Sequence, residues 1–223
     1  MYQENKPQYR ILLLIALAHG LNDLIQGVIP SIYPALQSKY ALTMAQVGVI
    51  TLCYQLSASI LQPLVGNYTD KHPKPYSQVL GMAFTTMGIV SLSLASSYTA
   101  ILCSVVFIGV GSSVFHPESS RVAFLASGGR RSFAQAIFQL GGNFGTALAP
   151  LLVILLLFSK KVIDGRVIEE SHQGNLIWFA GFSIFAMLIL LLIGKWRSIL
   201  LKLLKKKAKK PVVLPNLTRA QIR

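Results

Sequence analysis

Three ionisable residues follow one another closely within a long apolar segment of this chain. The segment begins near Tyr98, and His116, Glu118 and Arg121 stand in it with no loop signal before them. A charged side chain at the centre of a membrane helix costs about 2.5–3.5 kcal/mol on insertion scales, so such residues usually mark a transport pathway or a proton relay. An alternative stays open, in which the helix ends near His116 and the ionisable residues belong to a turn.

A second apolar segment carries its own ionisable pair. His19, Asn22, Asp23 and Gln26 occupy positions i, i+3, i+4 and i+7, which share one face of a helix. One such residue alone often only hydrogen-bonds a neighbouring helix. Because lipid cannot satisfy polar groups, several helices with such stripes are predicted to face one shared polar space. Three further segments carry comparable polar stripes: Gln55, Ser59 and Gln62; Ser112, His116 and Ser119; and Gln135, Gln139 and Asn143.

The composition is that of a membrane protein. Of the 223 residues, 53% are hydrophobic and 13% are charged, whereas soluble domains average about 25% charged residues. Six apolar runs are long enough to span a bilayer core about 30 Å thick, over 11–33, 43–68, 76–96, 98–124, 132–158 and 174–194. We therefore expect an all-α polytopic membrane protein. Its third and sixth helices are poor in strongly polar residues and should separate the other four from lipid.

Other classes of chemistry find little support. Cys53 and Cys103 lie far apart in apolar runs and have neither a disulfide framework nor a metal-ligand spacing. A membrane-embedded enzyme that uses His116 and Glu118 is one alternative function. Residues two positions apart point about 200° apart on a helix, however, which is poor geometry for one metal ion. We expect no catalytic residues, no cofactor and no metal, and we keep an inert assembly subunit as a further alternative.

The positive charge lies mainly at one end of the chain. Ten of the 21 Lys and Arg fall between Lys195 and Arg223, with no aromatic residue interleaved over 202–210. A basic cluster after a membrane helix typically faces anionic lipid, so we expect the bilayer and no nucleic acid as partner. In the six-helix topology, 16 Lys and Arg lie on the side of the N-terminus and four on the other. The positive-inside rule then predicts an inner-membrane protein with both termini cytoplasmic, a six-helix unit over 1–194 and a basic tail over 195–223.

The fifth predicted helix has a face of small residues roughly opposite its polar stripe. Gly141, Gly145 and Ala149 recur at intervals of four. Small residues at this spacing let two helix backbones approach closely. We expect this face to be a packing surface.

The loop after the second predicted helix has a recognisable pattern. It reads Gly66-Asn-Tyr-Thr-Asp-Lys-His-Pro-Lys-Pro75. A Gly four residues before an acid, followed by basic residues, resembles the loop signature of the major facilitator superfamily. The resemblance implies that Gly66, Asp70, Lys71 and Lys74 form a conformational latch between moving helices; a solvated turn is the alternative.

With that loop, the whole chain resembles the N-terminal six-helix half of a major facilitator transporter. Such a half consists of two inverted three-helix repeats, with helices one, two, four and five lining the cavity. Val105 and Ala149 depart from the family pattern, since many proton-coupled members carry Arg and Gly at these places. Three runs are similar to the fosmidomycin-resistance group of efflux proteins: His19-Gly-Leu-Asn-Asp23, His116-Pro-Glu-Ser-Ser-Arg121 and Gln139-Leu-Gly-Gly-Asn-Phe-Gly145. Family members have about twelve helices, so the resemblance implies a truncated transporter, a separate second half or a homodimer.

These residues lead to one functional hypothesis, an antiporter half that exports a small organic compound against proton entry. By resemblance the compound is a fosmidomycin-like drug, and the activity would confer antibiotic resistance. We expect Asp23 and Glu118 to face one cavity and exchange protons, tuned by His19 and His116, because burial favours the protonated acid. Arg121 is expected to pair with Glu118 and to contact an anionic substrate. The remaining residues of the predicted substrate cavity are Asn22, Gln26, Gln55, Gln62, Gln135, Gln139 and Asn143.

Overall fold

The computed structural model describes residues 6–163 and 166–208, most of which form seven α-helices. Within these ranges, six helices are long and apolar enough to span a membrane, as the sequence predicts. The elements in chain order are α1 (Tyr9–Ser31), α2 (Tyr33–Tyr40), α3 (Met44–Lys71), α4 (Ser77–Leu94), α5 (Tyr98–Ala126), α6 (Arg131–Leu157), β1 (Phe158–Ile163), β2 (Arg166–Ser171), the 3-10 turn η1 (Gln173–Leu176) and α7 (Ile177–Ala208).

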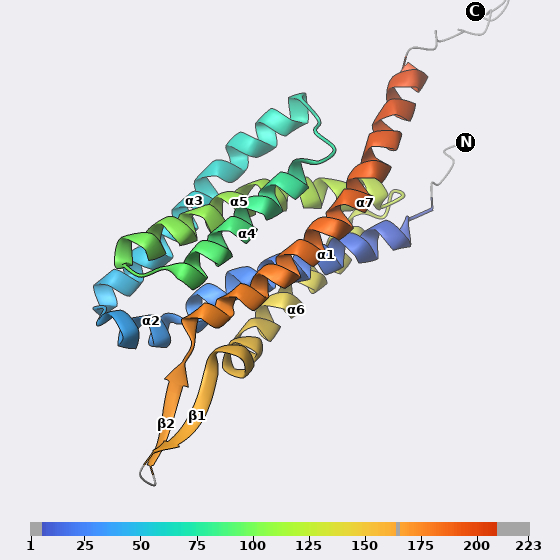
Figure 1. Ribbon diagram of the computed structural model, residues 1–223. Helices are drawn as coiled ribbons and strands as arrows, with labels where there is room; N and C mark the ends of the chain where they lie inside the picture. Colours follow the sequence, from blue (N-terminus) through green and yellow to red (C-terminus); the bar gives the residue numbers. More distant parts are fainter. Residues whose placement is uncertain (1–5, 164–165, 209–223) are drawn as a thin grey trace, which may run out of the picture.

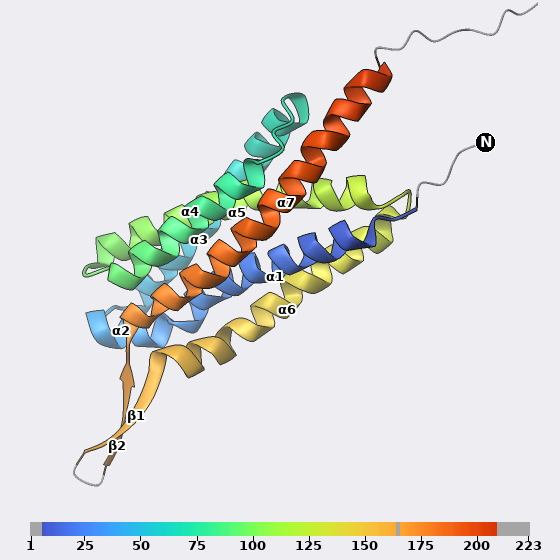
Figure 2. The ribbon, with the colours of Figure 1, turned by 45° about the vertical axis from the view of Figure 1, so that its right-hand side comes forward.

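The long helices form one bundle with an internal correspondence between its two halves. Helix α1 packs against α6, and α5 packs against both α3 and α4. Helix α7 lies against α4 and α1 (Figures 1 and 2). If α1, α3 and α4 are exchanged with α5, α6 and α7 respectively, the same set of pairings results. The α1–α6 pairing then corresponds to α5–α3, α4–α5 corresponds to α7–α1, and α4–α7 corresponds to itself. This is the relation expected of two inverted three-helix repeats.

The first described helix begins, and the last one ends, on the same side of the bundle. The start of α1 and the end of α7 lie at one end, and the β1–β2 hairpin extends from the other (Figure 1). The hairpin pairs Phe158 with Ser171 and Ile163 with Arg166 in antiparallel register. The predicted helices leave a loop over 159–173, so this hairpin was not expected.

Helix α5 continues through the ionisable run. It extends to Ala126 with Pro117 inside it, so the alternative that the helix ends near His116 is wrong. Helix α5 is held in the bundle by its neighbours, because α3, α4 and α6 all pack against it. His116, Glu118 and Arg121 therefore lie on a helix, whose 3.6-residue period decides which neighbours each side chain meets.

Helix α7 is longer than the sequence predicts. It runs to Ala208, past the expected end at residue 194, because Leu and Lys are strong helix formers and no Gly or Pro intervenes after Gly194. Arg197 lies on this extension and is 1% exposed. The predicted boundary between bundle and tail at 194/195 thus falls inside a packed helix.

The small-residue face of α6 is the packing surface that its spacing predicts. A Cβ on Gly141 would collide with the carbonyl oxygen of Ala16, and one on Gly145 with that of Gly20. A Cβ added to Gly27 of α1 would lie 2.7 Å from the Cβ of Ala149. The absence of side chains here lets α1 and α6 approach at backbone distance, which fixes the position of α1 relative to α6.

Helices α3 and α6 are the most open members of the bundle. Apolar residues on both stay exposed, among them Leu52, Ile60 and Leu64 on α3 and Phe144 and Leu155 on α6. Their predicted polar stripes lie partly on the same open faces, because Gln55, Gln139 and Asn143 are exposed. The polar residues of α1 and α5 thus meet each other, while those of α3 and α6 lie partly on a free surface.

Candidate functional site

A first cluster of ionisable groups lies where α1 meets α5. Asp23 Oδ2 is 3.1 Å from His19 Nε2, and Asp23 Oδ1 is 3.3 Å from His116 Nε2. His19 and Asp23 are one turn apart on α1, and His116 approaches from α5. The side chains are 2%, 15% and 26% exposed for His19, Asp23 and His116, so the carboxylate sits between one buried and one accessible imidazole.

The protonation of this cluster follows from its hydrogen bonds. His19 Nδ1 is 2.8 Å from the carbonyl oxygen of Phe138, and His116 Nδ1 is 3.0 Å from that of Ser112. A carbonyl oxygen only accepts, so each Nδ1 must carry a proton. A neutral imidazole would then turn the lone pair of Nε2 toward the carboxylate of Asp23, which is repulsive. A second proton on each ring, or another cation, makes both contacts attractive.

Neighbouring polar groups hold the carboxylate in place. Asn22 Nδ2 donates to Asp23 Oδ1 at 3.1 Å, and Gln26 Nε2 approaches the same oxygen at 3.4 Å. The Gln26 amide oxygen in turn accepts from the hydroxyl of Tyr54 on α3 and, at 3.2 Å, from Ser112 Oγ on α5. The predicted residues Asn22 and Gln26 thus belong to the Asp23 cluster, and Gln26 connects it to α3.

Three residues around the cluster were not predicted from the sequence. Phe138 stacks on the His19 ring with centroids 3.9 Å apart, and Gly142 of α6 lies against both His19 and Asp23. A Cβ at Gly142 would come within 2.6 Å of Asp23 Oδ2 and closer still to the His19 ring. An aromatic residue or Gly on a membrane helix is usually a packing residue, so neither carries a distinct local signal. Tyr54 was missed for the same reason.

A second cluster surrounds Glu118 at the end of the bundle that carries the chain ends. Glu118 is fully buried and accepts from Ser77 Oγ at 2.6 Å, from Arg121 Nη1 at 2.5 Å and from Arg197 Nη1. Arg121 also pairs with Asp70 at the end of α3. Two acids and two guanidinium groups therefore join α3, α4, α5 and α7 in one network of balanced charge.

This arrangement corrects the expectation that Glu118 and Asp23 face one cavity. His116 pairs with Asp23 across the α1–α5 contact, whereas Glu118 points toward α4 and α7. The reason is the angle of about 200° between positions two apart on a helix. The enzyme alternative loses its proposed His116–Glu118 site for the same reason. Arg121 does pair with Glu118, as the i, i+3 spacing predicts.

The predicted latch also has different partners. Asp70 pairs with Arg121, and within the described ranges neither Lys71 nor Lys74 pairs with it. Lys71 and Lys74 are exposed; Lys74 contributes its backbone carbonyl, which accepts from Arg197 at 3.3 Å. The carbonyl of Gly66 lies 3.4 Å from Arg121 Nη2. Arg197 was missed because it stands in a run of basic residues that resembles a solvated tail.

The other predicted cavity residues lie in three places. Gln135 bonds the hydroxyl and carbonyl of Ser120 at 3.0 Å, and with Arg121 it lines a hollow of about 580 Å³ beside the Glu118 cluster. Gln139 donates to Asn143 at 3.1 Å on the open face of α6. Gln55 is exposed and Gln62 is half-buried on α3. The described structure therefore brings Asn22 and Gln26 to Asp23, and places the remaining five elsewhere.

Comparisons with known proteins agree with this architecture. The sequence is 46% identical to the fosmidomycin resistance protein of Escherichia coli (strain K12) over 94% of this chain and 49% of that protein. It is 42% identical to the uncharacterized MFS-type transporter YfnC of Bacillus subtilis (strain 168), over 84% of this chain and 43% of YfnC. The chain thus spans about half the length of these relatives.

Solved structures show the same fold. A bacterial homologue of the human lysosomal transporter Spinster, in an inward-facing and unoccupied conformation, superposes with a TM-score of 0.65 at 17% identity, covering 86% of this chain and 43% of that one. The transporter FucP in the outward conformation gives a TM-score of 0.57 at 17% identity, covering 86% and 49%. The pattern of the Major Facilitator Superfamily matches residues 15–219. The chain belongs to the major facilitator superfamily.

Proposed function

We propose that this chain is one half of a secondary transporter that exports a small organic compound in exchange for protons, with Asp23 as the coupling acid. The observation that carries the proposal is the contact of Asp23 with two imidazoles whose Nδ1 atoms are already committed to backbone carbonyls. In this geometry His19 and His116 each bind Asp23 attractively only when Nε2 is also protonated. Proton loss therefore weakens the contact between α1 and α5 directly.

The solvent accessibility of the Asp23 cluster supports a role in proton exchange in addition to helix packing. His116 and Asp23 remain partly accessible while His19 is buried, so protons can reach the cluster from the His116 side. Gln26 and Tyr54 extend the hydrogen bonds from Asp23 to α3. A change in the charge of Asp23 is thus felt by α1, α3 and α5.

The proposed substrate follows from the relatives. The fosmidomycin resistance protein is the relative at 46% identity, so we propose a fosmidomycin-like compound, which is an anion, and efflux as the direction. The substrate would contact the polar groups on the open faces of α3 and α6, among them Gln55, Gln62, Gln139 and Asn143. Gln135 and Arg121 line the hollow at the end of the bundle through which an anion would pass.

The Glu118 cluster is assigned a different role, that of the conformational latch. Asp70, Arg121, Glu118 and Arg197 tie α3, α5 and α7 together through charged contacts at one end of the bundle, and the Ser77 hydroxyl adds α4. Such contacts are specific to one arrangement of helices, so their rupture accompanies a change between inward- and outward-open forms. We further propose that this end faces the cytoplasm, because 16 Lys and Arg lie on that side against four on the other.

The open apolar faces of α3 and α6 are the proposed contact surface for a second six-helix half, or for a second copy of this chain. Because the chain spans about half of its relatives, the transport test uses a chimera. The chain is joined to the C-terminal half of the Escherichia coli relative, and pH-driven fosmidomycin uptake is measured in inverted membrane vesicles. The chain alone is measured in parallel, where uptake would indicate a functional homodimer.

In the chimera, Asp23→Asn should reduce pH-driven uptake to background yet leave exchange of internal for external compound, since the carboxylate that binds the two protonated imidazoles is gone while the helices remain packed. His72→Gln, on the exposed end of α3, is the matched control and should transport normally. An Asp23→Asn variant that still pumps with unaltered pH dependence would show that Asp23 has no coupling role.

A further inference from the structure

We propose that His19, Asp23 and His116 form a binding site for a divalent transition-metal ion of the Zn²⁺ type. The proposal concerns binding to the isolated chain and goes beyond the transport function. The three donors come from α1 and α5, and their ligand atoms all lie within 4.8 Å of one another. Two imidazoles and one carboxylate are the ligand set of many zinc sites with an open fourth position.

The separations between donors match those around a tetrahedral ion. With Zn–N and Zn–O bonds of about 2.0–2.2 Å, neighbouring ligand atoms in a tetrahedron lie roughly 3.3–3.5 Å apart. The observed separations are 3.1 Å from His19 Nε2 to Asp23 Oδ2 and 3.3 Å from His116 Nε2 to Asp23 Oδ1, and one ligand atom from each of the three residues lies within 4.8 Å of the other two. The three residues are therefore close enough to bind one ion after adjustment of their side chains.

The hydrogen bonds of the two histidines already orient the nitrogen lone pairs that a metal ion would bind. Metal-ligating histidines nearly always donate the other ring N–H to a carbonyl or carboxylate, which fixes the tautomer. His19 does so to Phe138 and His116 to Ser112, so both neutral rings direct an unprotonated Nε2 toward Asp23. Asn22 donates to Oδ1 of the carboxylate, which leaves Oδ2 to the ion.

The net charge of the site is the same with a metal ion as with two extra protons. Zn²⁺ with two neutral imidazoles and one carboxylate carries +1, as do two imidazolium rings with one carboxylate. The polar groups around the cluster therefore face the same net charge in both states. They include the Gln26 amide, which approaches Asp23, and the Tyr54 hydroxyl, which is bonded to Gln26. The partly exposed His116 gives the ion an approach and leaves the fourth position to water.

The site escapes notice in the sequence because its ligands are on two helices. His116 and Glu118 stand close together in the sequence and are the pair a motif search finds, yet they point to different neighbours. The true partner of His116 lies on α1. Only the packing of α1 against α5 brings the three donors together.

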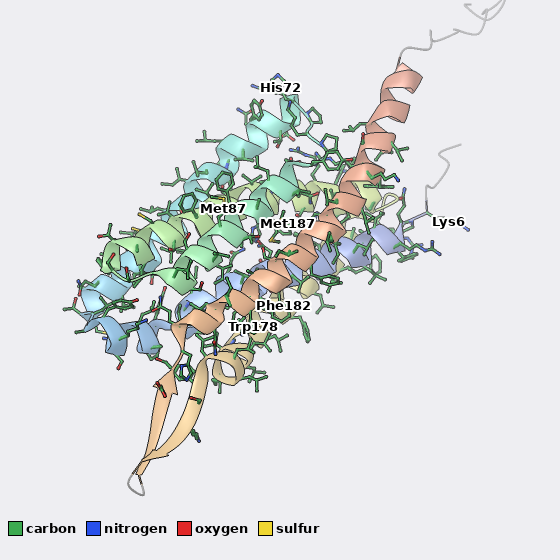
Figure 3. All side chains as sticks on the ribbon, viewed as in Figure 1. Lys6, His72, Met87, Trp178, Phe182 and Met187 are labelled. Carbon is green, nitrogen blue, oxygen red and sulfur yellow. The ribbon has the colours of Figure 1, made fainter. Side chains whose placement is uncertain are left out.

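The test is direct metal binding by the full 223-residue chain, purified in detergent without a histidine tag. The parent carries His72→Ala and His172→Ala, which removes the two other histidines; His72 lies at the far tip of α3 (Figure 3). Equilibrium dialysis with Zn²⁺ should give one ion per chain, and Co²⁺ should produce the intense visible absorption of a tetrahedral site. In this parent, His19→Gln, Asp23→Asn and His116→Gln should each weaken binding by about tenfold or more. Glu170→Gln, which removes an exposed charge on the β1–β2 hairpin, should not.

A replacement ligand separates loss of the site from loss of the fold. His116→Cys should retain one Co²⁺ per chain and add a thiolate-to-cobalt charge-transfer band, which the parent, with Cys53 and Cys103 present, should lack. Absence of stoichiometric binding by the parent would overturn the proposal. So would binding that persists undiminished in the three variants, since the ion would then be held elsewhere. Neither result bears on Asp23 as the coupling acid, because no transport is measured.

Discussion

The buried pair of Glu118 and Arg197 gives the sharpest test of this structure. Glu118 is fully buried and Arg197 is 1% exposed, and the two are joined across the α5–α7 contact. Removing one partner of a buried ion pair costs about 3–5 kcal/mol, because the other charge is left uncompensated. We therefore expect Arg197→Met and Glu118→Gln each to destabilise the bundle strongly.

The contacts also predict the order of the two effects. Without Arg197, Glu118 keeps Arg121 and the Ser77 hydroxyl, so the cost of Arg197→Met should lie near the lower end, about 3 kcal/mol. Without the carboxylate, Arg197 retains only the carbonyl of Lys74, at 3.3 Å, among its described acceptors. Glu118→Gln should thus be the more destabilising change. The double variant should fall short of the sum by about 0.5–3 kcal/mol, the range measured for residues in contact.

Unfolding in SDS, followed by helical circular dichroism and by tryptophan fluorescence, measures these effects. Trp196, next to Arg197, places a reporter beside the perturbed contact. Lys195→Met is the matched control, because Lys195 is exposed on the same turn and should change stability by no more than about 0.5 kcal/mol. A change that small for Arg197→Met would refute the reasoning, because Arg197 would then contribute no more to stability than the exposed Lys195.

Three further predictions concern the latch, the packing of the site and the topology. Asp70→Asn should slow transport by shifting the balance between inward- and outward-open forms. It should cost less than about 1 kcal/mol of stability, since the Asp70 side chain is 68% exposed. Lys71→Gln is the control, and thiol accessibility measures the conformational shift. Gly142→Ala should cost about 1–3 kcal/mol and impair coupling by displacing His19 from Asp23, whereas Gly181→Ala, which meets nothing within 4 Å, should be neutral or stabilising by thermal melting. Reporter domains placed in the β1–β2 turn and after the last residue should report opposite compartments, and one shared compartment would contradict the topology.

The fold could be predicted from the sequence because the membrane leaves few choices. A spanning segment must satisfy its own backbone, so each long apolar run implies a helix, and all six expected helices are present. The small-residue face of α6 could be predicted too, since backbone contact with Ala16 and Gly20 requires residues without large side chains. These features depend on one segment at a time, and local sequence determines them.

The candidate site could be predicted only in part, because its contacts join distant segments. The stripe around Asp23 was visible, but its pairing with His116 instead of Glu118 depends on how α5 is rotated against α1. Arg197 carries no local signal at all, since basic residues beyond a membrane helix are normally solvated. Its burial becomes favourable only through Glu118, a residue of another helix.

The two clusters together explain why the run from His116 to Arg121 is so dense in ionisable residues. One turn of α5 holds both of them: His116 reaches Asp23 on α1, and Glu118 and Arg121 reach α7 and α3. Because a helix is stiff over so short a length, a rotation or shift of α5 that breaks the first contact must also strain the second. Loss of a proton from the cluster of His19, Asp23 and His116 and rupture of the latch would then be coupled mechanically by this segment of α5, without any shared cavity or common cation between the two acids.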